Sequence, residues 1–259
     1  MERPFLQMMH RSRVRCKSNL ILALDVVDDD MERMVSRCLG ILEEVAPFIC
    51  GLKLNRQILL PLGLARTRET VVKRAKELNL PLIMDCKVND VGHTNVEIAR
   101  RYFESGFDAI TASPFVGWLE GLSPVFDVAR KDGKGVILLV YMSHRGANEG
   151  YGQIVVDEKT GKHLRQFEVF AQRAVDWNAD GAVVGATSPE KIGMVKRMLG
   201  NAVPIYSPGV GVQGGDALTA LRYGADYLII GRSIFESKNP SEAARGILTS
   251  LKSVLGWTR

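Results

Sequence analysis

The sequence has no hydrophobic run long enough to cross a membrane and no recognisable export signal. No apolar stretch approaches the roughly 20 residues that a spanning helix needs. The opening stretch MERPFLQMMHRSRVRCKSN lacks the apolar core of a secretory signal. A composition of 46% hydrophobic and 24% charged residues is typical of an ordinary globular protein. We therefore expect a soluble, cytoplasmic protein with no membrane partner.

Cysteine is scarce and widely spaced. The four cysteines are Cys16, Cys38, Cys50 and Cys86. No two of them form a CxxC pair, so the spacing fits neither a zinc site nor a disulfide framework. We expect all four to be reduced, and either buried or incidental.

A general excess of positive charge is also missing, although the net charge is +5. Residues 1–18 hold five basic residues and one acidic residue, which accounts for +4 of that charge. The rest of the chain is close to neutral. We therefore predict a short, flexible basic arm at residues 1–18 and regard nucleic-acid binding as the less favoured explanation.

Eight short apolar runs alternate with helical patterns from residue 19 onward. The runs lie at residues 19–25, 48–55, 81–87, 109–114, 136–142, 181–186, 203–209 and 227–232. Nearly continuous apolar runs are typical of parallel strands that helices cover. Between and after them, helical patterns lie at residues 30–47, 69–80, 95–106, 188–200 and 240–256. Eight such units in about 240 residues predict a single (β/α)8 barrel over residues 19–259.

An open, doubly wound sheet is the main alternative fold. No GxGxxG motif follows the first strand, and no linker or low-complexity segment divides the chain. Polar residues also recur at the ends of many strands, which favours the barrel. The longest irregular stretch, residues 143–162, contains QIVVDEKTGKHL, which predicts a small hairpin turning at Thr160 and Gly161 on the rim of the site.

Polar side chains gather where the predicted strands end. These residues are Asp25, Lys53, Asp85, Lys87, Ser143 and Arg232. In a (β/α)8 barrel they all lie on the carboxyl-terminal face, which is where such enzymes place their chemistry. Agreement among several strand ends therefore predicts an active site there.

The stretch MDCKVNDVGHT, residues 84–94, has the densest charge. Asp85 and Lys87 are two residues apart, so on a strand they point the same way. A solvated ion pair, worth at most about 1 kcal/mol, is the simpler explanation. We favour a functional pair, because charges in a narrow barrel mouth need partners and tend to be functional. Lys53 could instead extend to solvent or form an imine, but neighbouring carboxylates would hold both lysines protonated, as proton donors.

The segment SPGVGVQGGD, residues 207–216, predicts a phosphate site. Its glycines let backbone N–H groups approach an anion closely, and Gly231 and Arg232 follow on the next strand. An arginine can clamp phosphate with two parallel hydrogen bonds. Loops after strands 7 and 8 are the usual phosphate site of this fold. Ordinary turn glycines beside a surface arginine are the alternative.

Together these motifs resemble the orotidine 5′-monophosphate decarboxylase family, over about residues 19–256. The matching segments are LALD, GLKLN, DCKVNDVGHT, MSHRG, SPGVGVQGGD and IIGRS, in order and spacing. The resemblance implies decarboxylation of orotidine 5′-monophosphate to uridine 5′-monophosphate, the last step of UMP biosynthesis, without a metal or organic cofactor. It also implies a homodimer with shared active sites. Val91, Arg145 and the extra length after Gly150 depart from the family pattern.

The resemblance also implies roles for individual residues. Lys53, Asp85, Lys87 and Asp90 would form a charged network, with Lys87 as proton donor to C6 of the pyrimidine. Asp90 and Thr94 would reach into the neighbouring subunit's site. The remaining binding residues would be Asp25 and Lys53 for the ribose, Ser143 for the pyrimidine, and Gln213, Arg232, Pro208 and Gly231 for the phosphate.

Two other functions stay open from the sequence. A related ketogulonate- or hexulose-phosphate enzyme shares the Asp-x-Lys-x-x-Asp pattern but uses Mg2+ and a sugar phosphate; Thr94 and the Gln213 segment favour the pyrimidine enzyme. A non-catalytic barrel that binds phosphate ligands or RNA through the basic arm is the second alternative.

Overall fold

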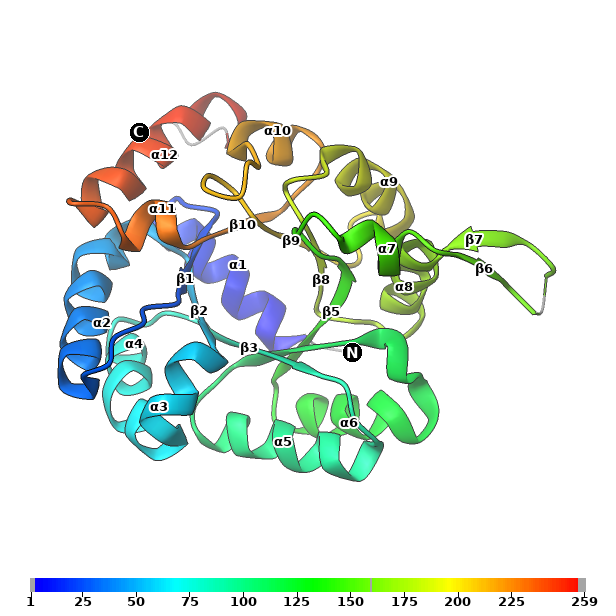
Figure 1. The fold of residues 1–259 in the computed structure, drawn as a ribbon, viewed down its shortest axis with the longest axis horizontal. Coiled ribbons are helices and arrows are strands. Elements are labelled where there is room, and N and C mark those ends of the chain that lie inside the picture. The colour runs from blue at the N-terminus through cyan, green and yellow to red at the C-terminus, as the bar shows by residue number, and fades with distance from the viewer. Residues whose placement is uncertain (1–2, 159, 256–259) are drawn as a thin grey trace.

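The computed structural model describes residues 3–158 and 160–255, and its core is a closed barrel of eight parallel strands (Figure 1). The barrel strands are β1 (Leu20–Leu24), β2 (Gly51–Asn55), β3 (Leu82–Val88), β4 (Ala109–Ala112), β5 (Gly135–Tyr141), β8 (Gly181–Val184), β9 (Ile205–Pro208) and β10 (Tyr227–Ile230). Their order around the barrel is β1-β10-β9-β8-β5-β4-β3-β2, and β1 pairs with both β10 and β2. The predicted (β/α)8 barrel is confirmed.

Helices cover the outside of the barrel (Figure 1). They are α2 (Met31–Val45), α3 (Arg56–Thr67), α4 (Lys73–Glu77), α5 (Gly92–Glu104), α6 (Ser123–Lys131), α8 (Gln166–Asp176), α9 (Pro189–Leu199), α10 (Ala217–Arg222), α11 (Arg232–Phe235) and α12 (Pro240–Leu255), with short helical turns at Ala46–Phe48, Arg68–Val72, Pro114–Val116 and Trp118–Leu122. Strand side chains that point outward pack with the helices in one large apolar core. No helix within the described ranges is long and apolar enough to cross a membrane.

The predicted flexible arm is wrong, because residues 4–16 form helix α1 (Pro4–Cys16) across the amino-terminal end of the barrel (Figure 1). Phe5 and Met9 are fully buried and join the inward-pointing strand residues in a second, interior core. Phe5 also packs against Gly135, where an added Cβ would lie 2.3 Å from the ring. Two apolar residues at i and i+4 in a cationic segment make a stripe too narrow to recognise in the sequence alone.

Polar contacts fix both ends of α1. Arg3 donates to the backbone oxygens of Ala179 and Ala202 and pairs with Asp180. At the other end, Arg15 donates to the Asn79 oxygen at 2.8 Å. Part of the positive charge of this segment therefore holds the helix to the barrel.

The base of the barrel repeats one hydrogen-bonding device three times. An aspartate just before a barrel strand accepts from a backbone N–H of the preceding barrel strand. The pairs are Asp108 with Leu82, Asp180 with Val136, and Asp226 with Ile205. Basic side chains then neutralise these carboxylates: Lys76 and Lys134 bind Asp108, and Lys196 binds Asp226. The device ties the amino ends of neighbouring strands together.

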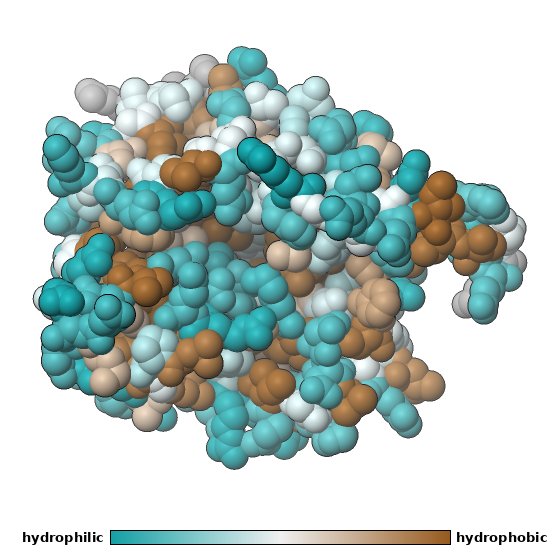
Figure 2. All heavy atoms as spheres, viewed as in Figure 1, coloured by the Kyte–Doolittle hydropathy of each residue, from teal (hydrophilic) through white to brown (hydrophobic). Residues whose placement is uncertain are grey.

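The segment between β5 and α8 contains helix α7 (Ala147–Tyr151) and an antiparallel hairpin of β6 (Ile154–Val156) and β7 (His163–Arg165). The predicted hairpin is confirmed, with Gly161 in the left-handed region at φ 68°. It projects from the barrel, and Figure 2 shows hydrophobic side chains upon it. Ile154 and Val156 are more than half exposed.

All four cysteines are free, as the sequence predicted. Cys38, Cys50 and Cys86 are buried and Cys16 is partly buried. Burial raises the pKa of the Cys38 thiol to about 12, which keeps it protonated and unreactive.

The packing of α1 predicts that truncating its buried ring destabilises the whole barrel. Phe5→Ala should lower the free energy of unfolding by about 3–5 kcal/mol, because it leaves a cavity in the interior core. Val14→Ala is the matched control, since Val14 lies on the same helix and is 47% exposed. It should change stability by about 0.5 kcal/mol or less. Denaturant unfolding measures both values, and equal small effects would contradict the packing of α1.

Candidate active site

A cavity of about 230 Å3 opens at the carboxyl ends of the strands. Apolar side chains of the interior core, Ile83, Ile137, Val183, Tyr206 and Ile229, are part of its lining. The predicted site residues that line it are Asp25, Lys53, Asp85, Lys87, Ser143, Pro208, Gln213, Gly231 and Arg232. The barrel thus brings these residues together from six of its eight strands or the loops that follow them.

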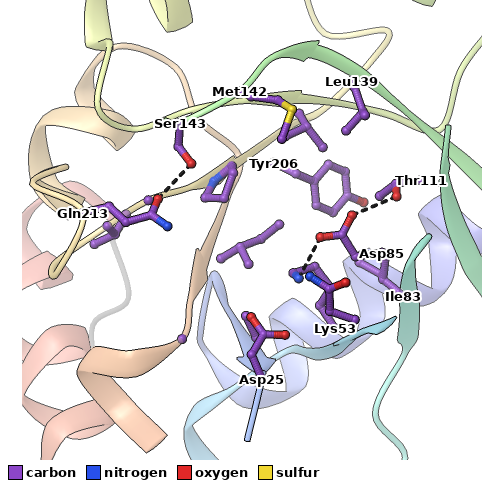
Figure 3. Close-up of a pocket in the computed structure, with 18 of the residues that line it drawn as sticks. Asp25, Lys53, Ile83, Asp85, Thr111, Leu139, Met142, Ser143, Tyr206 and Gln213 are labelled. Atoms are coloured by element: carbon purple, nitrogen blue, oxygen red, sulfur yellow. Dashed lines mark hydrogen bonds and ion pairs between the residues drawn. The ribbon is translucent and has the colours of Figure 1, made fainter. Parts of the chain in front are cut away.

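The Asp85 carboxylate is the centre of a charged network (Figure 3). Lys53 Nζ lies 2.9 Å from Asp85 Oδ2, and Lys87 Nζ lies 2.7 Å from Oδ1. Thr111 Oγ1 also donates to Oδ1, at 2.9 Å. Lys53 is only 5% exposed, so this is a partly desolvated network rather than a surface ion pair.

Both ends of the Lys53–Asp85 pair are held in the charged form. Burial opposes the charge of Asp85, but the positive charges of Lys53 and Lys87 and their hydrogen bonds hold its pKa well below the usual range. Burial likewise lowers the pKa of Lys53, but the charges of Asp85 and Asp25 outweigh burial and raise it above the ordinary value. The Lys53–Asp85 pair therefore keeps both of its charges around neutral pH.

Asp85 and Lys87 both face the cavity, as their spacing predicted, but β3 is not regular there. Its register with β4 shifts between Met84 and Val88, and Lys87 has φ 51°, in the left-handed region. A lysine adopts that conformation rarely. The side chains still alternate, with Met84, Cys86 and Val88 in the outer core, so the β-bulge changes the backbone position of Lys87 rather than the face on which it lies.

Asp25 follows β1 and lines the same cavity. Its Oδ1 atom is buried and accepts no hydrogen bond from any group in the described part of the chain. Burying a carboxylate oxygen without a hydrogen-bond donor costs free energy. This atom is therefore suited to accept a hydrogen bond from a ligand hydroxyl.

The glycine-rich loop after β9 folds tightly beside the cavity. Gly209, Gly211 and Gly214 have positive φ angles between 83° and 94°. At Gly211 an added Cβ would lie 2.1 Å from Ser233 Oγ, so the backbone of the loop packs directly against the Ser233 side chain at the start of α11. This approach places Arg232 and Gln213 on the rim of one cavity.

Ser143 and Gln213 are directly bonded across the mouth (Figure 3). Ser143 Oγ donates to Gln213 Oε1 at 2.8 Å. The bond orients the Gln213 amide so that its NH2 group remains available to a ligand. Ser143 and Gln213 therefore form one polar unit rather than two separate ligand contacts.

The structure does not bring Asp90 and Thr94 into this cavity. Asp90 is exposed, and its carboxylate accepts from the backbone of Val91 at 2.7 Å. Buried Asn95 fixes the backbone of Asp90, since Asp90 N donates to Asn95 Oδ1 at 2.9 Å. Asp90 precedes α5 and Thr94 lies in its first turn, and neither residue lines the site of its own chain.

Sequence reasoning missed three polar residues that line the cavity: Asn55, Thr111 and Ser233. Ser233 directly follows Arg232 and accepts from Val212 N at 3.3 Å. Thr111 is 2% exposed within a strand that is otherwise alanine and isoleucine. The only sequence signal was a lone polar residue inside an apolar strand, and threonine is common in strands.

Comparisons with known proteins agree with this geometry. The model of the orotidine 5′-phosphate decarboxylase / HUMPS family matches residues 18–247. An orotidine 5′-phosphate decarboxylase of Thermococcus kodakarensis is 36% identical over 239 residues, covering 92% of this chain and 99% of that protein. Among solved structures, an orotidine 5′-monophosphate decarboxylase of Methanocaldococcus jannaschii, complexed with the inhibitor BMP, has a TM-score of 0.75 and 31% identity, and covers 90% of this chain and 98% of that one.

A Leishmania donovani UMP synthase structure has a TM-score of 0.86 and 25% identity. The alignment covers 97% of this chain and 56% of that one. The family model covers most of the barrel, and the alignment with the Thermococcus kodakarensis enzyme covers nearly the full length of both chains. The chain belongs to the orotidine 5′-phosphate decarboxylase / HUMPS family.

Proposed function

We propose that this protein decarboxylates orotidine 5′-monophosphate to uridine 5′-monophosphate, the last step of UMP biosynthesis, without a metal or organic cofactor. The observation that carries the proposal is the Asp85 carboxylate ion-paired with both Lys53 and Lys87 in a cavity that has Arg232 on its rim. Family membership supports the same reaction class.

The phosphate of the nucleotide binds at the Arg232 side of the cavity. Arg232 is exposed and belongs to the short helix α11 beside the glycine-rich loop. The Gln213 amide, oriented by Ser143, provides a second donor. Pro208 and Gly231 line the cavity between them and contribute backbone. A guanidinium and an amide together supply the charge and hydrogen bonds that a phosphate dianion requires.

The ribose and the pyrimidine occupy the space between this rim and the charged network. The unsatisfied Asp25 Oδ1 and the Lys53 ammonium bind the ribose hydroxyls, which need both an acceptor and a donor. Ser143 binds the pyrimidine. This order along the cavity directs the C6 carboxylate of the base towards Asp85 and Lys87.

Lys87 performs the proton transfer. The C6–carboxylate bond breaks, CO2 leaves, and the bonding electron pair stays on C6. The Lys87 ammonium stabilises that negative charge and then donates a proton to C6, after which water restores the proton of the neutral amine. The ion pair of Lys87 with Asp85 supports this role, because it holds the ammonium inside the cavity.

One charge interaction does not account for the whole acceleration. At about 4 Å and an effective dielectric constant near 20, an ammonium and a carbanion interact by about 4 kcal/mol. The remainder comes from remote binding energy, which Arg232 and Gln213 supply by holding a phosphate that takes no part in bond breaking. That energy places the substrate carboxylate beside Asp85 in a preformed field.

We also propose that the active protein is a homodimer in which Asp90 and Thr94 complete the partner's site. Asp90 is exposed and does not line the cavity of its own chain, in which Lys87 lies. Asn95 joins this region to the neighbouring segment by donating to Gly121 O at 3.2 Å. Hydrophobic side chains are exposed in both regions: Val91 lies beside Asp90, and Phe115 and Leu119 lie in the helical turns that lead to Gly121. Exposed apolar groups beside Asp90, whose carboxylate lies outside the cavity of its own chain, support an interface there.

The contacts of Asp85 favour this reaction over a Mg2+-dependent sugar-phosphate reaction. Both carboxylate oxygens of Asp85 already accept from lysines, and Oδ1 also accepts from Thr111. A hard cation would have to displace two ammonium groups to bind there. The same oxygens are well placed to orient a proton donor.

The free cysteines support a cytoplasmic location for the enzyme. Reducing compartments keep thiols in this form, and three of the four are buried.

Replacing Lys87 tests the proton donor. Lys87→Ala should lower kcat by about 10²- to 10⁴-fold, the usual contribution of a positioned general acid. Binding of uridine 5′-monophosphate should persist, because the phosphate and ribose contacts remain. Steady-state assays and calorimetry measure the two effects. Lys131→Ala, at the exposed end of α6, is the matched control and should behave as wild type. Wild-type turnover by Lys87→Ala would rule out this role.

Mixing variants tests the shared site. Lys87→Ala and Asp90→Ala homodimers should each be nearly inactive, but a randomised 1:1 mixture should recover about a quarter of wild-type activity, since half of its dimers contain one complete site. Mixing Lys87→Ala with Lys53→Ala is the control without recovery, because both lysines belong to the same chain's site. Verified Lys87→Ala/Asp90→Ala heterodimers that show no recovery would establish that each site is self-contained.

A further inference from the structure

Thr111 contacts all three residues of the β3 bulge that carries the charged network. Met84 pairs with Ile110 and Val88 pairs with Ala112, so three residues of β3 lie opposite the single residue Thr111. The three are Asp85, Cys86 and Lys87. Each of them has a hydrogen bond to Thr111.

These hydrogen bonds involve both the side chain and the backbone of Thr111. Its Oγ1 donates to Asp85 Oδ1 at 2.9 Å (Figure 3) and accepts from Lys87 N at 2.9 Å. Its backbone oxygen accepts from Cys86 Sγ at 3.5 Å. The side chain is 2% exposed, so water does not replace these contacts.

The direction of the two hydroxyl bonds is fixed by chemistry. A backbone N–H can only donate, and an ionised carboxylate can only accept. The Thr111 proton therefore points to Asp85 and a lone pair faces Lys87 N. One hydroxyl thus connects the backbone of Lys87 to the oxygen that its own ammonium binds.

Lys87 needs such a support because its backbone is strained. A lysine at φ 51° lies in a conformation that persists only where the surrounding structure determines it. The hydrogen bond from Lys87 N to Thr111 is the contact that opposes relaxation to a regular strand. Relaxation to a regular strand would leave Lys87 on the same face as Asp85, but it would move the Lys87 backbone away from Thr111 and displace the ammonium from the position where it meets Asp85 Oδ1.

We propose that Thr111 is a positioning residue that holds the bulge of β3, so that the Lys87 ammonium stays where it pairs with Asp85 and faces the substrate. The expected effect on kcat rests on the proposed function. The expected change in the backbone of Lys87 rests on the geometry of the bulge alone. Thr111 acts through Lys87 and Asp85 and carries no proton to the substrate. Its hydroxyl determines how closely the ammonium approaches C6.

The kinetic test compares a variant without the hydroxyl with one that keeps it. Thr111→Val retains the shape of the side chain and should lower kcat about 100-fold, the effect of misplacing a reacting group by about 1 Å. KM should change by about threefold or less, because the phosphate contacts are untouched. Thr111→Ser should restore kcat to within about threefold of wild type. Wild-type kcat in Thr111→Val, or no recovery in Thr111→Ser, would overturn the proposal.

Thr67→Val separates positioning from stability. Thr67 is fully buried and its hydroxyl donates to Gly63 O at 2.8 Å, but it lies on α3 outside the cavity. This variant should lose stability and keep kcat. A drop in kcat equal to that of Thr111→Val would show that any lost buried hydroxyl has the same effect, and the proposal would fail.

A structural readout decides the proposal independently of turnover. In a crystal structure of Thr111→Val we expect Lys87 to leave the left-handed region and the Lys87 Nζ–Asp85 Oδ1 contact to be lost. Thr111→Ala gives the same readout if the valine variant does not fold, since alanine cannot clash. An unchanged φ and an unchanged contact would overturn the proposal. An inactive wild-type enzyme would instead refute the proposed function, and the variant structure would still decide the role of Thr111.

Discussion

The ion pairs of Asp85 with Lys53 and Lys87 impose the strictest requirement on this barrel, because all three groups are partly removed from water. Desolvated charges are tolerated only when their partners and hydrogen bonds are in place, and removing one partner typically costs about 3–5 kcal/mol. The fold meets that requirement with β2, β3 and β4, which supply Lys53, the aspartate–lysine pair and Thr111 respectively. The same arrangement keeps the Lys87 ammonium beside the Asp85 carboxylate in the cavity.

The two ends of the barrel have opposite roles. At the amino-terminal end, α1 covers the interior with Phe5 and Met9, and three aspartates join neighbouring strands. The carboxylates of these three aspartates are satisfied within the protein. At the carboxyl-terminal end, Asp25 Oδ1 has no donor among the described residues, and the Gln213 oxygen is bonded to Ser143, which orients the amide NH2 group for a ligand. The amino-terminal end therefore contributes mainly to stability, and the carboxyl-terminal end presents polar groups that can bind a ligand.

Much of this architecture was predictable, for identifiable physical reasons. Strands buried on both faces appear as continuous apolar runs, and polar residues at their ends identified the cavity lining from Asp25 to Arg232. Helix α1 escaped prediction because only Phe5 and Met9 anchor it within a cationic segment. Thr111 escaped because its role depends on the register shift opposite it, and no local pattern encodes which residue of β4 faces a bulge. The left-handed backbone of Lys87 is likewise a tertiary effect.

The central claim is that a fixed array of side-chain charges, without metal or organic cofactor, decarboxylates the nucleotide and protonates C6. The most direct measurement is turnover of orotidine 5′-monophosphate by the purified protein in deuterated water with excess chelator. The account predicts full activity and uridine 5′-monophosphate that carries one deuterium at C6. Absence of decarboxylation there, together with turnover of a sugar phosphate on adding Mg2+, would contradict it.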